Sequence, residues 1–234
     1  MQKIQILFQD QNIAVINKSA GLLSVPYPGF RGKTALSLLE ETMRKRGTYS
    51  AKHRPFAVHR LDRETSGVMM FALNERAQKT IMDNWQVMVT ERLYRAVAEN
   101  PRGAKASLPD SGTIDSPLAY NAYNQAFVPK GGADSKGGNF KTIPARTHYK
   151  IIARGARLTL FELSLDTGRK NQIRAHLASL GFPLAGDKNY RARTNPFGRL
   201  ALHARTLEFI DPWTKEKARF EIPEPADWEK ACRA

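Results

Sequence analysis

The apolar residues of this chain come in short runs, and these runs have the length of β-strands rather than of long helices. A continuous apolar run at residues 13–16 and the segment 67–73 are typical of buried strands, and residues 91–99 alternate as a half-buried strand does. Two further strands and a terminal hairpin are expected near 146–153, 157–165 and 200–223. Strands in sequential order with few helices between them favour an α+β fold, with a central, mainly antiparallel mixed sheet and flanking helices.

Three helices are expected between these strands. The first begins at the N-cap Thr34 and extends over residues 34–46. Its buried face is predicted to hold three residues, Leu36, Leu39 and Met43. A second helix is expected from residue 74 or 75 to about 85, and a third over 172–180, started by Asn171.

The charge of the chain is the first indication of function. Lys and Arg total 37 against 22 Asp and Glu, so the formal net charge is +15. A sequence pI of about 10.1 favours a polyanionic partner, with nucleic acid first and an anionic membrane surface second. A basic protein with no such partner is the alternative.

Cysteine content and hydropathy exclude several classes of protein. The single cysteine, Cys232, permits neither a disulfide within the chain nor a cysteine-based metal site. No segment approaches the ~18 apolar residues of a membrane span, and the first residues lack the pattern of a signal peptide. We therefore expect a cytoplasmic protein without membrane association.

The segment 58–67 is dense in reactive residue types and precedes a buried strand. Its Asp62 has Arg60 and Arg63 as sequence neighbours, and nearby positive charge favours an ionised carboxylate. Such a carboxylate can act as a nucleophile, a base or a metal ligand. A salt-bridged loop aspartate, flanked by hydroxyl side chains that form local turn bonds, is the structural alternative.

The segment 166–176 joins a strand to the third helix, whose N-terminal N–H groups can receive an anion. Four polar side chains are gathered there, Arg169, Lys170, Asn171 and Gln172. Within the helix, Arg174 follows the buried position of Ile173 and can approach the end of the sheet. A solvated helix start is the alternative interpretation.

Other chemistries lack their residue patterns. The five histidines show no metal-ligand spacing, and neither a phosphate-binding loop, a G-x-G-x-x-G segment nor a G-x-S-x-G segment is present. Tyr94 lies on the strand 91–99, where a tyrosine by itself most often belongs to the core. The glycine-rich segment 130–141 is expected to be a flexible loop, either the tip of a long hairpin or a basic finger that contacts RNA.

Together these segments resemble the RluA-type family of RNA pseudouridine synthases over nearly the whole chain. The residues that carry the resemblance are Val15-Ile16-Asn17-Lys18, Gly21-Leu22-Leu23, His59-Arg60-Leu61-Asp62, Thr65-Ser66-Gly67, Tyr94-Arg95-Ala96, Gly168-Arg169, Gln172-Ile173-Arg174, Gly186-Asp187 and Leu202-His203-Ala204. Departures such as Ser19, Glu64 and Lys170-Asn171 bear on the choice of substrate more than on chemistry.

The resemblance implies roles for several residues. Asp62 would be the covalent nucleophile, Tyr94 would stack on the target base, and Arg174 would pair with Asp62. Arg60 would fill the space left by a flipped uridine. Apart from the resemblance, Arg169 and Lys170 at the helix start could bind phosphate, and we expect the RNA contacts to come from Arg60, Arg63, Arg169, Lys170, Asn171 and Gln172. The family uses no metal or cofactor.

The resemblance also sets expectations for the whole protein. They are a pseudouridine synthase fold with an RNA-binding cleft and a single catalytic domain over 1–234, without the N-terminal S4 domain of some relatives. The substrate would be ribosomal or transfer RNA, and the protein a monomer.

Two rival functions stay open from the sequence. One is a non-catalytic RNA-binding protein that retained the fold. The other is a glycosidic hydrolase, but such enzymes usually need two carboxylates, and Glu64 is the only close candidate beside Asp62.

Overall fold

The computed structural model describes residues 4–101, 108–129 and 140–233. Its described chain divides into two compact units. The first consists of Met1–Arg92 with His203–Glu224, and the second of Leu93–Leu202 with Pro225–Ala234. Residues 130–139 of the glycine-rich segment lie outside the described residues, so the loop expected there stays a prediction.

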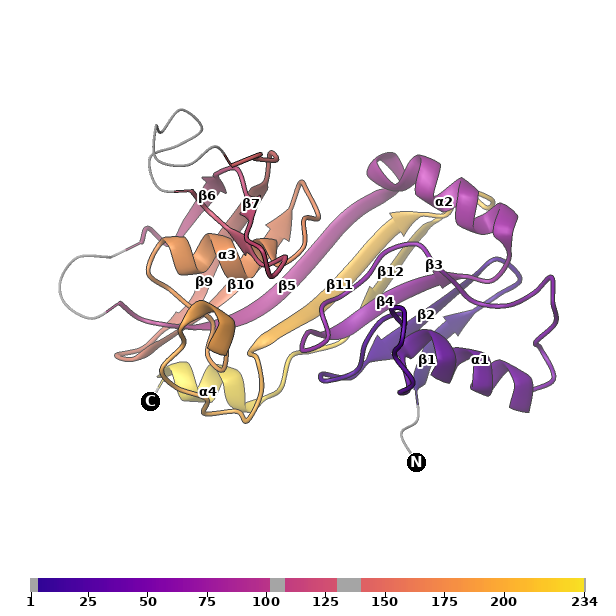
Figure 1. Ribbon diagram of the computed structural model, residues 1–234, viewed down its shortest axis with the longest axis horizontal. Helices are drawn as coiled ribbons and strands as arrows, with labels where there is room; N and C mark the ends of the chain where they lie inside the picture. Colours follow the sequence, from indigo (N-terminus) through magenta and orange to yellow (C-terminus); the bar gives the residue numbers. More distant parts are fainter. Residues whose placement is uncertain (1–3, 102–107, 130–139, 234) are drawn as a thin grey trace. The chain divides into compact units, whose positions relative to one another are not determined.

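The first unit is built on a mixed sheet (Figure 1). Its strands are β1 (Gln5–Gln9), β2 (Ile13–Lys18), β3 (Phe56–Ala57), β4 (Ser66–Ala72), β11 (Leu202–Ile210) and β12 (Lys217–Glu221). The order is β1-β2-β4-β11, with β12 beside β11 and β3 beside β4. β4 and β11 pair in parallel, whereas the other pairs are antiparallel.

Two helices belong to the first unit. α1 (Ala35–Lys45) begins at the predicted cap Thr34, whose side chain accepts a hydrogen bond from the Ser37 N–H. The predicted buried face is wrong in one position, because the helix buries Leu38 while Leu36 stays only partly buried. α2 (Glu75–Met88) is three residues longer than expected and leads directly into β5 (Val89–Glu99).

The core of the first unit lies between α2 and the sheet. Ala77, Ile81 and Met88 of α2 pack in one cluster with Val68, Met70 and Ala72 of β4. All seven residues of β4 are buried, which explains its unbroken apolar sequence. The segment that carries Asp62 therefore enters a strand covered on both faces.

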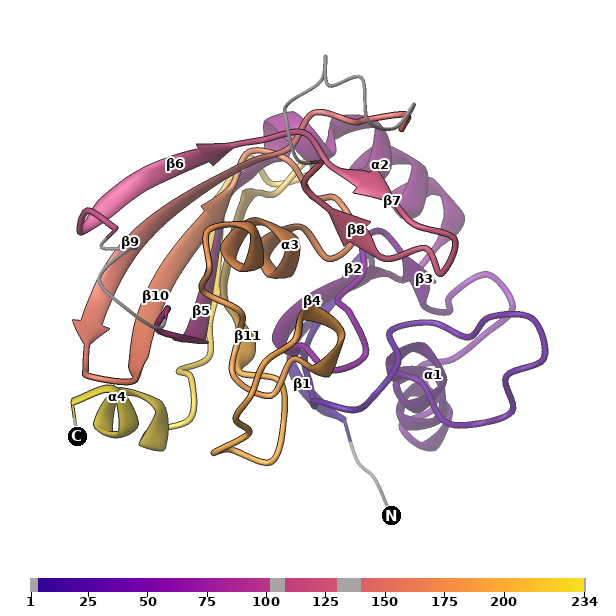
Figure 2. The same cartoon turned by 60° about the vertical axis from the view of Figure 1, so that its left-hand side comes forward.

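The second unit has an antiparallel sheet in the order β5-β10-β9-β6. Its other strands are β6 (Ser111–Asp115), β9 (Arg146–Arg154) and β10 (Leu158–Leu165). Two helices pack on it, α3 (Gln172–Ser179) and α4 (Asp227–Arg233) (Figure 2). A hairpin of β7 (Ala119–Tyr120) and β8 (Ala126–Phe127) and a short 3₁₀ turn, η1 (Lys188–Tyr190), complete the unit.

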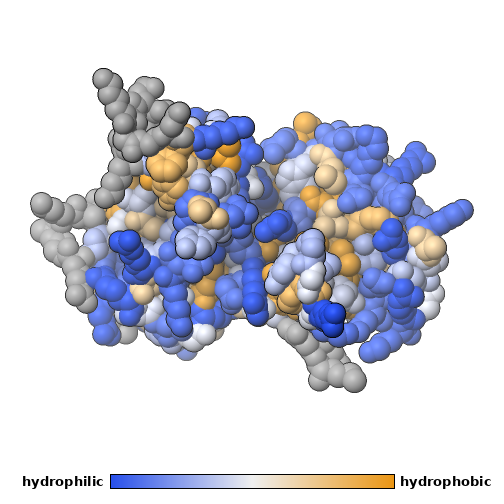
Figure 3. Space-filling model, viewed as in Figure 1, coloured by the Kyte–Doolittle hydropathy of each residue, from blue (hydrophilic) through white to orange (hydrophobic). Residues whose placement is uncertain are grey.

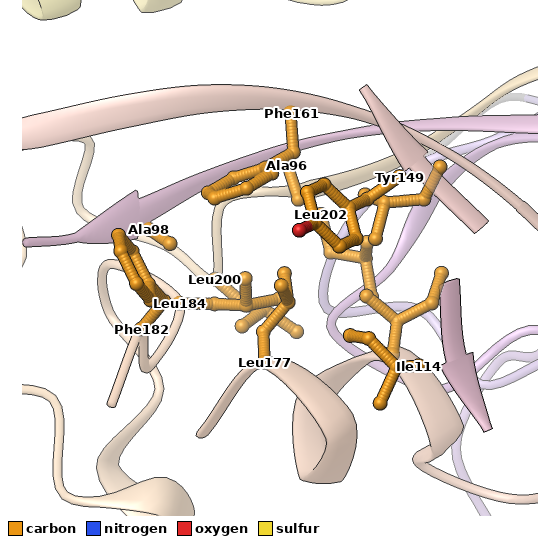
Figure 4. Packing of buried hydrophobic residues seen from close by; sticks show 12 residues of the cluster. Ala96, Ala98, Ile114, Tyr149, Phe161, Leu177, Phe182, Leu184, Leu200 and Leu202 are labelled. Carbon is orange, nitrogen blue, oxygen red and sulfur yellow. The ribbon is translucent and has the colours of Figure 1, made fainter. Parts of the chain in front are cut away.

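The predicted alternation of residues 91–99 assigns the two helices to opposite faces of this sheet. Ala96 and Ala98 of β5 share a buried cluster with Leu177 of α3, together with Phe161 and Phe182 (Figure 4). Val97, the residue between the two alanines, belongs to a different cluster with Trp228 and Cys232 of α4. Since successive strand residues point to opposite faces, α3 and α4 cover different sides of β5.

These features confirm the predicted fold class, an α+β fold with a mainly antiparallel mixed sheet and flanking helices. The predicted RNA-binding cleft stays a prediction. No helix within the described residues is long and apolar enough to cross a membrane. One face of the molecule shows mostly hydrophilic residues, as the composition leads us to expect (Figure 3).

Candidate active site

Asp62 lies in the connection between β3 and β4, in a tight turn that leads into the buried strand. The Thr65 N–H donates to the Asp62 carbonyl at 3.1 Å and closes this turn. Asp62 is partly buried, whereas Arg60, Arg63 and Glu64 are exposed. The loop thus presents one partly buried carboxylate among exposed charged side chains.

The chain segment 18–24 is bonded to both sides of Asp62. The Lys18 ammonium donates to the carbonyls of Ser19, Leu22 and Arg63 at 3.0, 2.6 and 3.1 Å. The Ser24 hydroxyl donates to the Leu61 carbonyl at 2.7 Å and accepts from the Leu61 N–H at 3.1 Å. Neither side chain was assigned a role from the sequence, because a lysine at the end of an apolar run gives no local sign of burial.

The side chain of Arg63 also turns toward this segment. Its Nε donates to the Gly21 carbonyl at 3.1 Å, and the same Nε lies 3.6 Å from the Glu64 carboxylate. Arg63 was predicted to contact RNA. The structure shows two protein partners for its guanidinium, and the RNA contact stays a prediction.

The loop is fixed at its downstream end by glycine and histidine. Gly67 has a φ of +117°, and a Cβ there would meet the Ala204 carbonyl oxygen at 2.0 Å. Ser66 Oγ lies 2.7 Å from His203 Nδ1, and His203 Nε2 lies 3.0 Å from the Ile222 carbonyl. Because a carbonyl only accepts, Nε2 carries the proton and Nδ1 accepts from Ser66.

His59 fastens the upstream end of the loop. Its Nε2 accepts the N–H of Met70 in β4 at 2.9 Å, and its ring lies against Trp85 with 4.8 Å between centroids. Burial, with a smaller contribution from the charge of Arg92, lowers the pKa of His59 to about 3. The imidazole is therefore neutral at physiological pH and acts as a hydrogen-bond acceptor.

In the second unit, Tyr94 lies on β5 opposite Leu163 of β10. It is partly buried and packs against the cluster that contains Ala96 and Phe161. Tyr94 thus belongs partly to the core, the usual place of a tyrosine on a strand. Its proposed stacking on a base stays a prediction.

Arg174 projects from α3 into a buried ion pair. Its Nε and Nη2 donate to the two carboxylate oxygens of Asp187 at 2.7 and 2.8 Å, and its guanidinium carbon lies 5.1 Å from the centroid of the Tyr190 ring. Arg174 is only 8% exposed and Asp187 only 2%. Two fixed hydrogen bonds hold the plane of the guanidinium in one orientation. The pairing of Arg174 with Asp62, which belong to different units, stays a prediction.

The predicted anion-binding residues around the start of α3 divide into two kinds. Arg169 is exposed, and Lys170 and Asn171 are partly so. Gln172 is 2% exposed, and its amide bonds to Thr167, Thr147 and the main chain of Arg169 and Arg146. Asn171 starts the helix as predicted, in a left-handed conformation and without a side-chain cap. Gln172 therefore fastens the loop that presents the other three.

The described residues contain no group of three or more His, Cys, Asp or Glu side chains placed to hold a metal ion. Asp62 in the first unit and Tyr94 and Arg174 in the second stay the predicted catalytic residues.

Comparison with known proteins identifies the class. A family model described as RNA pseudouridylate synthase matches residues 12–179. The uncharacterized RNA pseudouridine synthase YhcT of Bacillus subtilis (strain 168) is 36% identical over 234 residues, covering 99% of this chain and 72% of the relative. The ribosomal large subunit pseudouridine synthase D of Neisseria meningitidis serogroup A is 34% identical, covering 96% of this chain and 59% of the relative.

Solved structures agree on the fold. Human RNA pseudouridylate synthase domain containing 4 superposes with a TM-score of 0.70 at 22% identity, covering 96% of this chain and 90% of that chain. The predicted pseudouridine synthase fold is thereby confirmed. The chain belongs to the RNA pseudouridine synthase family, whose members are isomerases that modify RNA.

Proposed function

We propose that this protein converts a specific uridine of RNA to pseudouridine, with Asp62 as the nucleophile. The observation that carries the proposal is the carboxylate itself: it is partly buried, and the main chain around it is bonded on both sides. Family membership supplies the reaction, and the net charge of +15 suits a polyanionic substrate.

The reaction requires the uracil to leave the ribose and to return in another orientation. The uridine first flips out of the folded RNA, at a cost of a few kcal/mol that phosphate contacts offset. The bond between N1 and C1′ breaks with the help of Asp62, the uracil rotates, and a bond forms between C5 and C1′. The proton on C5 leaves and N1 gains one, so atoms balance without a redox partner. Asp62 acts either directly at C1′ or through the base.

The remaining site residues have proposed parts in the same event. Tyr94 would stack on the uracil and take part in removing the C5 proton. Arg174, held by Asp187, would pair with the Asp62 carboxylate. Arg60, which is exposed, would occupy the gap left in the RNA. Arg63, Arg169, Lys170 and Asn171 would contact the RNA backbone.

The substrate is proposed to be ribosomal or transfer RNA. Ribosomal RNA is the first candidate, because several relatives are named ribosomal large subunit pseudouridine synthase D. The protein would act in the cytoplasm as a monomer and as a single catalytic domain. Light scattering would test the monomer, since a measured mass of twice 26.3 kDa would contradict it.

A tritium-release assay tests the reaction and the nucleophile together. RNA labelled at uridine C5, from cells that lack this protein, is incubated with wild type, with Asp62→Asn and with the control Asp83→Asn. Asp83 forms an exposed ion pair with Lys79 on α2 and is remote from the loop in sequence. We expect release with wild type and the control, and a loss of at least about 1,000-fold with Asp62→Asn.

Three results would contradict the proposal. Equal release by wild type and Asp62→Asn would remove Asp62 as the nucleophile. Free uracil as the product would establish a hydrolase. RNA binding without release from either the ribosomal or the transfer RNA fraction would favour a non-catalytic binding protein.

A further inference from the structure

We propose that Lys18 and Ser24 are positioning residues that fix the main chain on both sides of Asp62 and so set the direction in which its carboxylate points. The inference rests on the proposed function for its catalytic consequence. The geometric part, that these two side chains immobilise residues 61–63, stands on the hydrogen bonds alone.

Lys18 is an unusual residue to find in the interior. It is the last residue of β2, two positions after the apolar run 13–16, and is 0% exposed. Its backbone pairs with Gly67 of β4, so the strand register brings it beside the downstream end of the catalytic loop. A buried ammonium is costly unless its charge and donors are satisfied. Three main-chain carbonyls accept from its three N–H groups, and one of them belongs to Arg63.

Ser24 holds the other side of the nucleophile. Its hydroxyl makes two hydrogen bonds with the same residue, Leu61, once as donor and once as acceptor. Ser24 is 4% exposed. A hydroxyl group is the smallest side-chain group that can bind both the N–H and the C=O of one residue. Alanine at this position would leave two buried main-chain groups without that partner.

These hydrogen bonds, together with the turn bond of Thr65, hold the carbonyl groups of three consecutive residues. The carbonyl of Leu61 accepts from Ser24, that of Asp62 from Thr65, and that of Arg63 from Lys18. Rotation of the peptide planes next to Asp62 would break at least one of these bonds. The carboxylate can then move only through its own side-chain torsions. A reacting group must be held within about 0.5 Å of its productive place, and a misplacement of about 1 Å lowers a rate about 100-fold.

The test separates positioning from general stability. Ser24→Ala and Lys18→Met are compared with Asn74→Ala. This control removes the N-cap bond of α2 to the Ala77 N–H at 2.8 Å and the bonds of the Asn74 amide to Gln11 and Asn12, none of which belongs to the loop. Urea unfolding shows whether the control loses comparable stability. We measure the single-turnover rate of tritium release at saturating enzyme, the Kd for the same RNA, and the hydrogen exchange of the Leu61 amide.

We expect Ser24→Ala to lower the single-turnover rate about 10- to 100-fold with Kd within about threefold. The Leu61 amide should exchange faster, since its acceptor is gone. Asn74→Ala should keep both the wild-type rate and the protection of Leu61. Lys18→Met should behave as Ser24→Ala does if it folds, and Ser24→Ala decides the question if it does not.

Several outcomes would overturn the proposal. A rate within about twofold of wild type in Ser24→Ala, with Leu61 deprotected, would show that the fixed main chain is irrelevant to the chemistry. An equal rate loss in Asn74→Ala would show that the lower rate comes from lost stability and not from positioning. Unchanged protection of Leu61 would show that Ser24 does not hold the chain. If wild type releases no label, the proposed function fails, and Leu61 exchange still decides the geometric part.

Discussion

The imidazole of His59 should make the stability of the protein depend on pH in a calculable way. Burial lowers its pKa from 6.5 to about 3 in the folded protein, whereas the unfolded chain titrates near the ordinary value. Below pH 6.5 the unfolded chain therefore binds a proton that the folded protein does not bind. The contribution of His59 to the free energy of unfolding is therefore at its maximum above the unfolded pKa of 6.5. It decreases as the pH drops below that value and becomes constant below about pH 3.

The size of the effect follows from these two values. Between about pH 7.5 and about pH 5, His59 alone should lower the free energy of unfolding by about 2 kcal/mol. That figure is an upper bound, because His59 keeps part of its surface exposed. Protonation would also place a donor opposite the Met70 N–H, which now donates to Nε2 at 2.9 Å.

Urea unfolding of wild type and of His59→Gln at both pH values provides the measurement. Glutamine keeps an oxygen that can accept from Met70 but does not titrate, and all other titrations are common to both proteins. Tryptophan fluorescence is a suitable signal, because Trp85 lies against His59. The loss of stability on acidification should be smaller in the variant by up to about 2 kcal/mol. An equal loss in both proteins would refute the reasoning, since His59 would then titrate alike in the folded and unfolded states.

Three further predictions concern single groups or the whole surface. Gly67→Ala should lower the free energy of unfolding, measured in urea, by more than about 3 kcal/mol. The added Cβ would collide with the Ala204 carbonyl, and φ at this position is +117°. A loss under about 1 kcal/mol would mean that the two strands shift to accommodate the methyl group. Asp187→Asn should cost about 3 kcal/mol, because it removes the buried carboxylate that binds Arg174 through two hydrogen bonds; a near-neutral result in the same assay would contradict this. RNA affinity measured by fluorescence anisotropy should fall steeply with salt, about 1,000-fold between about 50 and 200 mM if six phosphates are contacted. A flat salt dependence would remove the electrostatic argument for the substrate.

Local sequence patterns were sufficient for the larger elements. Apolar runs located the longer strands but not β6, and Thr34 and Asn171 located the starts of α1 and α3. The short elements β3, β7, β8 and η1 were not predicted, because two or three residues carry no periodicity. α4 was missed as well, since its seven residues are too few for an amphipathic pattern.

For the candidate site, too, one part could be predicted from the sequence and another could not. Asp62, Tyr94 and Arg174 were found through motif resemblance, and the sequence also supplied the charge that suits RNA. Their surroundings were not foreseen. The loop that holds Asp62 depends on Lys18 and Ser24, which precede it by about 40 residues.

The sequence by itself determined where the longer strands and helices form, the family of the chain and the identity of its reactive side chains, because those properties reside in neighbouring residues or in whole motifs. Only the tertiary structure decided which polar groups are buried together: Lys18 with the Arg63 carbonyl, Arg174 with Asp187, and His59 with the Met70 N–H. The physical reason is that a polar group is tolerated in the interior only with a hydrogen-bond partner. That partner comes from whichever distant segment the strand register places beside it.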